Sequence, residues 1–273
     1  MTISLLVFAI SVGAGGFGAM VGIGGGLVIV PMLTLLLGVP IQTAIAASLI
    51  GVIATSMTAS AHYLELGLAD RRLGLVLLLA TVAGGITGGL TAGFLDERVL
   101  AGLFAVLLVG VAMQMLRQPK VVRTPAGPLT SGGLASSYFE PTDGKEVHYV
   151  ARRFRLGAVA SFVAGNVSGI LGVGGGVINV PVMNVAMGVP IRVATTTSTY
   201  MLGATAAASA VLYFAAGVLE PLLAGPVALG VFLGARVGAR FATRVSQRKL
   251  QLIFVVVAAV FAVQMLARAV GLT

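Results

Sequence analysis

Several long segments of this chain contain no charged residue, among them residues 73–95, 100–116 and 250–266. A helix needs about 20 consecutive apolar residues to cross the hydrocarbon core of a bilayer, and these segments reach or approach that length. Only 9% of the 273 residues are charged and 58% are hydrophobic. A soluble domain carries about 25% charged residues. The sequence therefore predicts an all-α polytopic membrane protein.

Several other classes of protein are excluded by what the sequence lacks. It has no cysteine, which rules out disulfides and thiolate metal sites, and its two histidines, His62 and His148, are far apart. The net charge of +9 comes mostly from Lys and Arg between apolar segments, so it indicates membrane orientation rather than nucleic-acid binding. The opening MTISLLVFAISVG lacks a basic region and a cleavage site, and we expect it to be a retained membrane segment.

The chain contains a duplication at a constant offset of 150 residues. Matching pairs include Pro31/Pro181, Ser48/Ser198, Tyr63/Tyr213, Gly84/Gly234 and Gly88/Gly238. Between the copies lies a stretch rich in Pro, Gly, Ser and charge, which is typical of a polar loop. We therefore predict an N-terminal transmembrane repeat over 1–118, a cytoplasmic linker loop over 119–151 and a C-terminal transmembrane repeat over 152–273.

The charge pattern predicts that the two copies, about 4–118 and 152–270, have inverted topology. Lys and Arg collect on cytoplasmic loops, and the basic linker is therefore placed inside. Counting spans backwards puts Arg71 and Arg72 inside, but the equivalent residues Pro221 and Leu222 carry no charge. The equivalents of the outer residues Asp96 and Glu97 are instead flanked by basic residues. Inversion requires an odd number of crossings per copy, so each copy should open with a helical hairpin broken at its glycine run.

The glycine runs are the strongest functional signal. The segments GIGGGLVIVP at 22–31 and GVGGGVINVP at 172–181 place Gly24, Gly25 and Gly26, and again Gly174, Gly175 and Gly176, before a short apolar stretch. A helix of roughly 12 residues spans only about 18 Å, so its first turn would lie at membrane depth. Free N–H groups there attract anions. The alternative is that these glycines serve close helix packing.

Polar residues beside these runs are candidate ligands for an anion. Ser48, Ser198 and Thr197 carry hydroxyls within apolar surroundings, and Asn166, Ser168, Asn179 and Asn184 cluster around the second run. Such groups can bind sulfonate or carboxylate oxygens, but they also bond to the backbone inside membrane helices. Arg236 is a further candidate, although an arginine can also reach the headgroups from a span. The pairs Gly84/Gly88 and Gly234/Gly238 are expected to pack helices.

The duplicated G-x-GGG-x4-P, followed by G-V-P and a Ser/Thr-containing helix, resembles the TauE/SafE family of sulfite and organosulfonate transporters. The resemblance covers 4–118 and 152–270. It implies transport of a sulfur-containing anion, such as sulfite or sulfoacetate, across the cytoplasmic membrane without a cofactor. The matching positions are Gly22, Gly24, Gly25, Gly26 and Pro31, and Gly172, Gly174, Gly175, Gly176 and Pro181. A Thr-Ser pair associated with the next helix stands as Ala47-Ser48 in the first copy and Thr197-Ser198 in the second.

The predicted function is thus a secondary transporter that works by alternating access, with the anion held at the half-helix starts near the midplane. A passive anion channel could use the same glycines and is the alternative. An enzyme is not expected, because two distant histidines supply no convergent base and nucleophile. The expected partners are a small anion and the lipid bilayer, without nucleic acid or metal, and a homodimer is left open.

Overall fold

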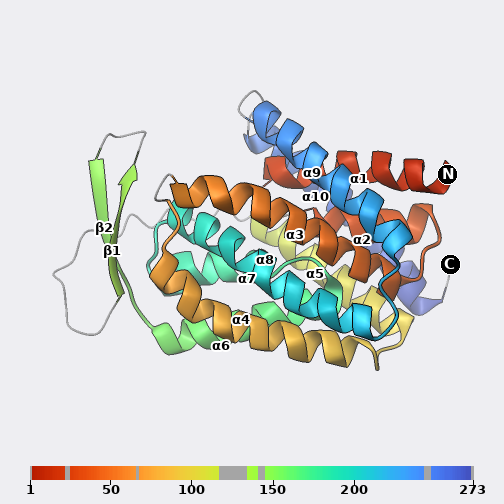
Figure 1. Ribbon diagram of the computed structural model, residues 1–273, viewed down its shortest axis with the longest axis horizontal. Coiled ribbons are helices and arrows are strands. Elements are labelled where there is room, and N and C mark those ends of the chain that lie inside the picture. Colours follow the sequence, from red (N-terminus) through yellow and green to blue (C-terminus); the bar gives the residue numbers. More distant parts are fainter. Residues whose placement is uncertain are drawn as a thin grey trace.

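The computed structural model describes residues 2–21, 25–65, 68–116, 134–140, 145–242 and 247–271. Helices dominate it (Figure 1). The first copy contains α1 (Thr2–Val21), α2 (Gly26–Leu36), α3 (Ile41–Glu65), α4 (Arg71–Ala92) and α5 (Glu97–Leu116). The second contains α6 (Phe154–Leu171), α7 (Gly176–Pro181) with the π-helix η1 (Val182–Ala186), α8 (Ile191–Ala215), α9 (Pro221–Ala242) and α10 (Gln247–Val270).

The bounds of the helices confirm the duplication. The bounds of α3 and α4 recur 150 positions later as those of α8 and α9, and α2 recurs as the continuous segment formed by α7 and η1. Within the described residues, six helices are long and apolar enough to cross a membrane, and α2 and the α7–η1 segment are shorter. The protein is therefore an all-α, multi-pass membrane protein, as predicted.

Glycines bring helices of different copies into close contact. A side chain at Gly84 or Gly88 of α4 would collide with the backbone of Phe162 or Asn166 in α6. Gly84 faces Phe162, and Gly88, one turn later in α4, faces Asn166, one turn later in α6. The two helices therefore run parallel. The same arrangement joins α9 to α1, where Gly234 and Gly238 face the backbone of Val12 and Gly16. These glycines pack helices, as expected. Helix α1 of the first copy packs against α9 of the second, and α6 of the second copy packs against α4 of the first.

The centre of the bundle is formed by α3 and α8, which are equivalent in the duplication. Ser56 Oγ of α3 donates a hydrogen bond to Thr199 O of α8, over 2.6 Å. Beyond the end of α3, Leu68 O accepts a hydrogen bond from Thr196 Oγ1, nearer to the start of α8. The two helices therefore run antiparallel. Much of α8 is buried, and several of its hydroxyls bond to its own backbone, which allows so polar a helix to lie inside the bundle.

Part of the predicted linker loop forms a β-hairpin, which corrects the expectation of a loop without regular structure. Strands β1 (Leu134–Glu140) and β2 (Lys145–Ala151) pair antiparallel, with Ser136 opposite Tyr149. The hairpin lies at one end of the helical bundle (Figure 1). The pairing was missed because an isolated two-stranded hairpin is marginally stable, and this one depends on aromatic packing against the helices.

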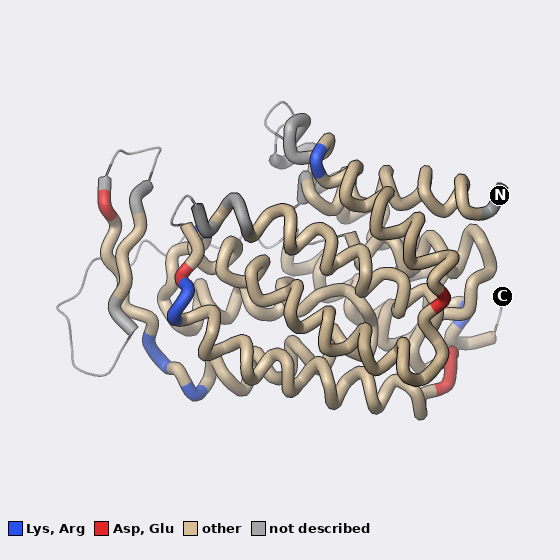
Figure 2. The backbone as a smooth tube through the Cα atoms, viewed as in Figure 1, with Lys and Arg blue, Asp and Glu red and all other residues tan. Residues whose placement is uncertain are grey.

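Basic residues mark the end of the bundle at which the hairpin lies. Helix α4 begins with Arg71 and Arg72, while Arg152 and Arg153 connect β2 to α6. Figure 2 shows these basic segments beside the hairpin, with an acidic segment on the hairpin and another next to the start of α4. The opposite end carries acidic segments, where α5 begins with Glu97, and a basic one. By the positive-inside rule we expect the hairpin end to lie on the cytoplasmic side, which stays a prediction.

Candidate functional site

The second glycine run breaks the helix between α6 and α7. Gly172 and Gly174 have φ angles of +68° and +77°, in a region that residues with a side chain rarely adopt, so glycine is required for this path. The next helix starts at once: Ile178 N and Asn179 N donate hydrogen bonds to Gly175 O, over 3.2 and 3.0 Å. The break at 172–175 is buried, and in the first turn of α7 Asn179 is buried while Gly176, Val177 and Ile178 are half-buried.

The first glycine run lies against the second. Gly24 lies outside the described residues. Gly25 O accepts hydrogen bonds from Val28 N and Ile29 N at the start of α2. A methyl group at Gly26 would lie 2.5 Å from Gly172 O, so the two breaks touch backbone to backbone. The two glycine runs, which are equivalent segments of the duplication, thus meet at one place in the interior.

Two of the predicted ligands bond to the protein itself. Ser48 Oγ donates to Gly172 O over 2.7 Å and to Ile45 O over 2.9 Å, which ties α3 to the second break. Thr197 Oγ1 accepts a hydrogen bond from Asp70 N over 2.9 Å. Both side chains are fully buried, and these bonds hold the copies together.

Three other side chains at the second break have no hydrogen-bond partner within the described part of the chain. They are Ser168 Oγ, Ser198 Oγ and both amide atoms of Asn179, and each residue is at most 1% exposed. Ser198 Oγ lies next to Gly176, and Asn179 follows Gly176 by one turn of α7. An unsatisfied buried polar group costs about 1–3 kcal/mol, so four such atoms on the helices around the second break make these residues candidates for binding a polar ligand.

The unpaired groups at the second break have no unpaired counterparts at the equivalent positions of the first copy, where, among the described residues, the buried hydroxyls without a partner are Ser11 Oγ and Thr34 Oγ1 instead. At the equivalent positions of the first copy stand Ile29 in place of Asn179 and Gly18 in place of Ser168. Ser48 is equivalent to Ser198, but its hydroxyl is bonded to Gly172 O. Of the predicted ligands, Gly175, Gly176 and Asn179 therefore lie at the start of α7, with Ser198 next to Gly176. Ser168 lies one turn before the break, in α6. The structure places Arg236 on the exposed side of α9.

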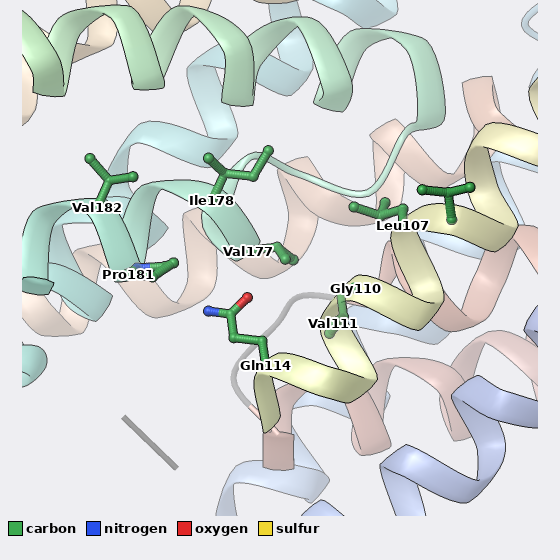
Figure 3. Close-up of a pocket in the computed structure, with 9 residues that line it drawn as sticks. Leu107, Gly110, Val111, Gln114, Val177, Ile178, Pro181 and Val182 are labelled. Carbon is green, nitrogen blue, oxygen red and sulfur yellow. The ribbon is translucent and has the colours of Figure 1, made fainter. Parts of the chain in front are cut away.

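A pocket of about 390 Å³ lies on another side of α7. Figure 3 shows it between α5 and the α7–η1 segment, with Gln114 extending toward Val177 and Pro181. The remaining lining residues are Val106, Leu107, Gly110, Val111, Ile178 and Val182. Val106 is 69% exposed, so the pocket opens on the outer surface of the bundle. With a single polar side chain, this pocket offers little to an anion.

A bundle of apolar helices with two broken segments meeting in its interior defines a class of multi-pass membrane protein in which many secondary transporters are found. The chain belongs to the sulfite exporter TauE/SafE family, whose model matches residues 7–265, and it is a membrane transporter of that family. It is similar to the probable membrane transporter protein YunE of Bacillus subtilis (strain 168), with 26% identity over 198 residues, covering 69% of this chain and 70% of that protein. No solved structure matches the chain.

Proposed function

We propose that this protein is a secondary transporter that moves a small sulfur-containing anion, such as sulfite, sulfoacetate or another organosulfonate, by alternating access. The observation that carries the proposal is the set of unpaired polar groups at the start of α7. Ser168, Ser198 and the Asn179 amide offer hydrogen-bond donors, and the first N–H groups of the helix add the positive end of its dipole. Neutral donors of this kind suit the oxygens of a sulfonate or sulfite.

The proposal includes an inverted repeat, which the direction of the helices supports. The equivalent helices α3 and α8 run antiparallel, as copies of opposite orientation require. The outer helices are exchanged, with α1 against α9 and α6 against α4. Two copies that exchange outer helices around a central site can rock relative to each other while the anion stays in place.

Replacing Asn179 by leucine tests the site. Leucine removes two unpaired polar atoms from the interior, and isoleucine already occupies the equivalent position in the first copy. We expect Asn179→Leu to unfold at the same or a higher temperature than the parent protein without ligand. We also expect it to lose the rise in melting temperature that sulfite or sulfoacetate gives the parent protein, since ligands stabilise the state that they bind.

The matched control is Asn184→Leu. Asn184 Nδ2 donates a hydrogen bond to Val189 O over 2.9 Å, so its loss should lower the melting temperature but leave the shift by sulfite intact. Acetate serves as a carboxylate comparison. If neither sulfite nor sulfoacetate stabilises the parent protein, or if Asn179→Leu keeps the full shift, the proposed site is wrong.

A further inference from the structure

A buried hydrogen bond between side chains fastens the β-hairpin to the helical bundle. Tyr149 Oη of β2 donates to Asp70 Oδ2 over 2.7 Å. The other carboxylate oxygen, Oδ1, accepts from Leu73 N and caps the start of α4. Asp70 is only 8% exposed. Burial raises the pKa of the Tyr149 hydroxyl above its ordinary value, so this group stays protonated and remains a donor.

One face of the hairpin packs on the bundle. Tyr138, Tyr149 and Ala151 are buried in an apolar cluster with Leu68 and Leu73, and the two tyrosine rings meet edge to face. The alternate residues Ser137, Glu146 and His148 are exposed. This alternation is that of a strand pair with one side against a core. The hairpin thus covers the end of the bundle as a separate layer.

The covered surface includes the far end of the broken helix that begins at the anion site. Met183 in η1 and Met187, which follows it, belong to the same apolar cluster as the tyrosines. Met187 O also accepts a hydrogen bond from Arg152 N, directly after β2, over 2.9 Å. The short α7–η1 segment therefore connects Asn179 at one end to the hairpin contact at the other.

A second connection runs through α8. The backbone N–H of Asp70 donates to Thr197 Oγ1, and Thr197 precedes Ser198, whose hydroxyl lies next to Gly176. A change in the position of α7 or α8 when an anion binds would thus shift Met187 O, which is bonded to Arg152 N, or Asp70, which is bonded to Tyr149. Methionine side chains are flexible, and π-helical turns occur frequently at functional sites, so this contact suits repeated docking and release.

We propose that the β1–β2 hairpin is a gate at the cytoplasmic end of the anion path, and that the Tyr149–Asp70 hydrogen bond is its latch. The gate rests on the proposed transport function. In the closed state the hairpin covers the ends of α4, α8 and η1. Release of Tyr149 from Asp70 lets the hairpin swing away from Met183 and Met187 and opens this end of the bundle.

The latch is tested with a single cysteine, since the chain contains none of its own. Ala151→Cys places a thiol on the buried face of the hairpin, where Ala151 is 4% exposed. We expect Tyr149→Phe, which keeps the ring and removes the hydroxyl, to raise the rate of labelling by a charged maleimide at least fivefold. Ser137→Ala is the control, because Ser137 bonds to Glu146 on the exposed face, and it should leave the rate unchanged. An unchanged rate in Tyr149→Phe contradicts the latch.

The gate is tested by fixing the hairpin in place. Val147 of β2 and Leu68, which precedes α4, both belong to the apolar cluster, and replacing them by cysteine leaves Tyr149 and Asp70 untouched. We expect a cleavable bifunctional maleimide to reduce sulfite flux into proteoliposomes at least tenfold, with recovery after cleavage. Unchanged flux in the linked protein contradicts the gate and leaves the transport function standing. Absence of flux in the unlinked protein contradicts the transport function instead, and the labelling rates then decide whether the hairpin opens.

Discussion

Individual glycines in the two runs have different tasks, although the runs look alike in sequence. Gly172 and Gly174 adopt left-handed backbone angles that shape the second break. Gly26 has helical geometry but allows α2 to touch the Gly172 carbonyl. Gly176 faces the Ser198 hydroxyl at an ordinary contact distance of 3.4 Å from where a methyl group would lie. Of the two interpretations left open by the sequence, packing therefore applies to Gly26, whereas ligand binding beside Gly176 stays a prediction.

Alanine at the equivalent positions Gly26 and Gly176 separates these roles. Gly176→Ala should fold with little change in melting temperature and lose the shift caused by sulfite, since the methyl group occupies the space beside Ser198 and the first N–H groups. Gly26→Ala places its methyl group 2.5 Å from a carbonyl oxygen. We expect overpacking to cost that variant about 1–3 kcal/mol of stability.

Differential scanning fluorimetry with and without sulfite measures both effects. A Gly176→Ala protein that binds sulfite as tightly as the parent would show that this glycine serves packing alone. A Gly26→Ala protein with unchanged stability would contradict the close contact of the two breaks.

The broken helices and their glycine-lined neighbours were predictable as elements because each has a signature within its own segment. The runs at 22–31 and 172–181 end one helix and start the next, and small residues four positions apart indicated close packing. The bonds of Ser48 and Thr197 were beyond prediction, since their partners, Gly172 O and Asp70 N, come from the opposite copy. The same holds for the hairpin, whose anchor Asp70 is far from Tyr149 in the chain.

The contact between α1 and α9 can be tested by two changes from glycine to alanine. Gly234→Ala would push a methyl group into the Val12 carbonyl of α1 and should lower the melting temperature. Gly13→Ala, in α1 itself, has no atom within 4 Å of the new group. Because alanine favours the helix by roughly 1 kcal/mol over glycine, Gly13→Ala should match or exceed the parent in stability. Equal melting temperatures for the two variants would contradict the close packing of α1 on α9.

At the scale of the whole molecule, the inverted arrangement stays a prediction that the antiparallel run of α3 and α8 supports. The sequence predicted it because Arg and Lys are concentrated at the start of the fourth helix of the first copy but after the equivalent helix of the second copy. The direction of the equivalent helices adds geometry to that argument. The sides of the membrane themselves require an experiment on intact cells, since helix packing alone carries no mark of inside or outside.

Cysteines at the equivalent positions Arg72 and Leu222 provide that experiment. Arg72 starts α4 and Leu222 starts α9, and both side chains are exposed. An inverted repeat places them on opposite sides, so an impermeant maleimide added to intact cells should label Leu222→Cys and spare Arg72→Cys until the membrane is opened. Labelling of both from the same side would establish a parallel repeat and overturn the topology.

The exchange of outer helices also sets the order in which the chain can mature during its synthesis. Helix α1 is synthesised before its glycine-lined partner α9, whose contact residue Gly238 comes more than 200 residues after Gly16. Until then the face of α1 that carries Gly16 has only lipid or other segments to contact. The first copy therefore cannot complete its native packing on its own. The native bundle assembles only after α9 has entered the bilayer.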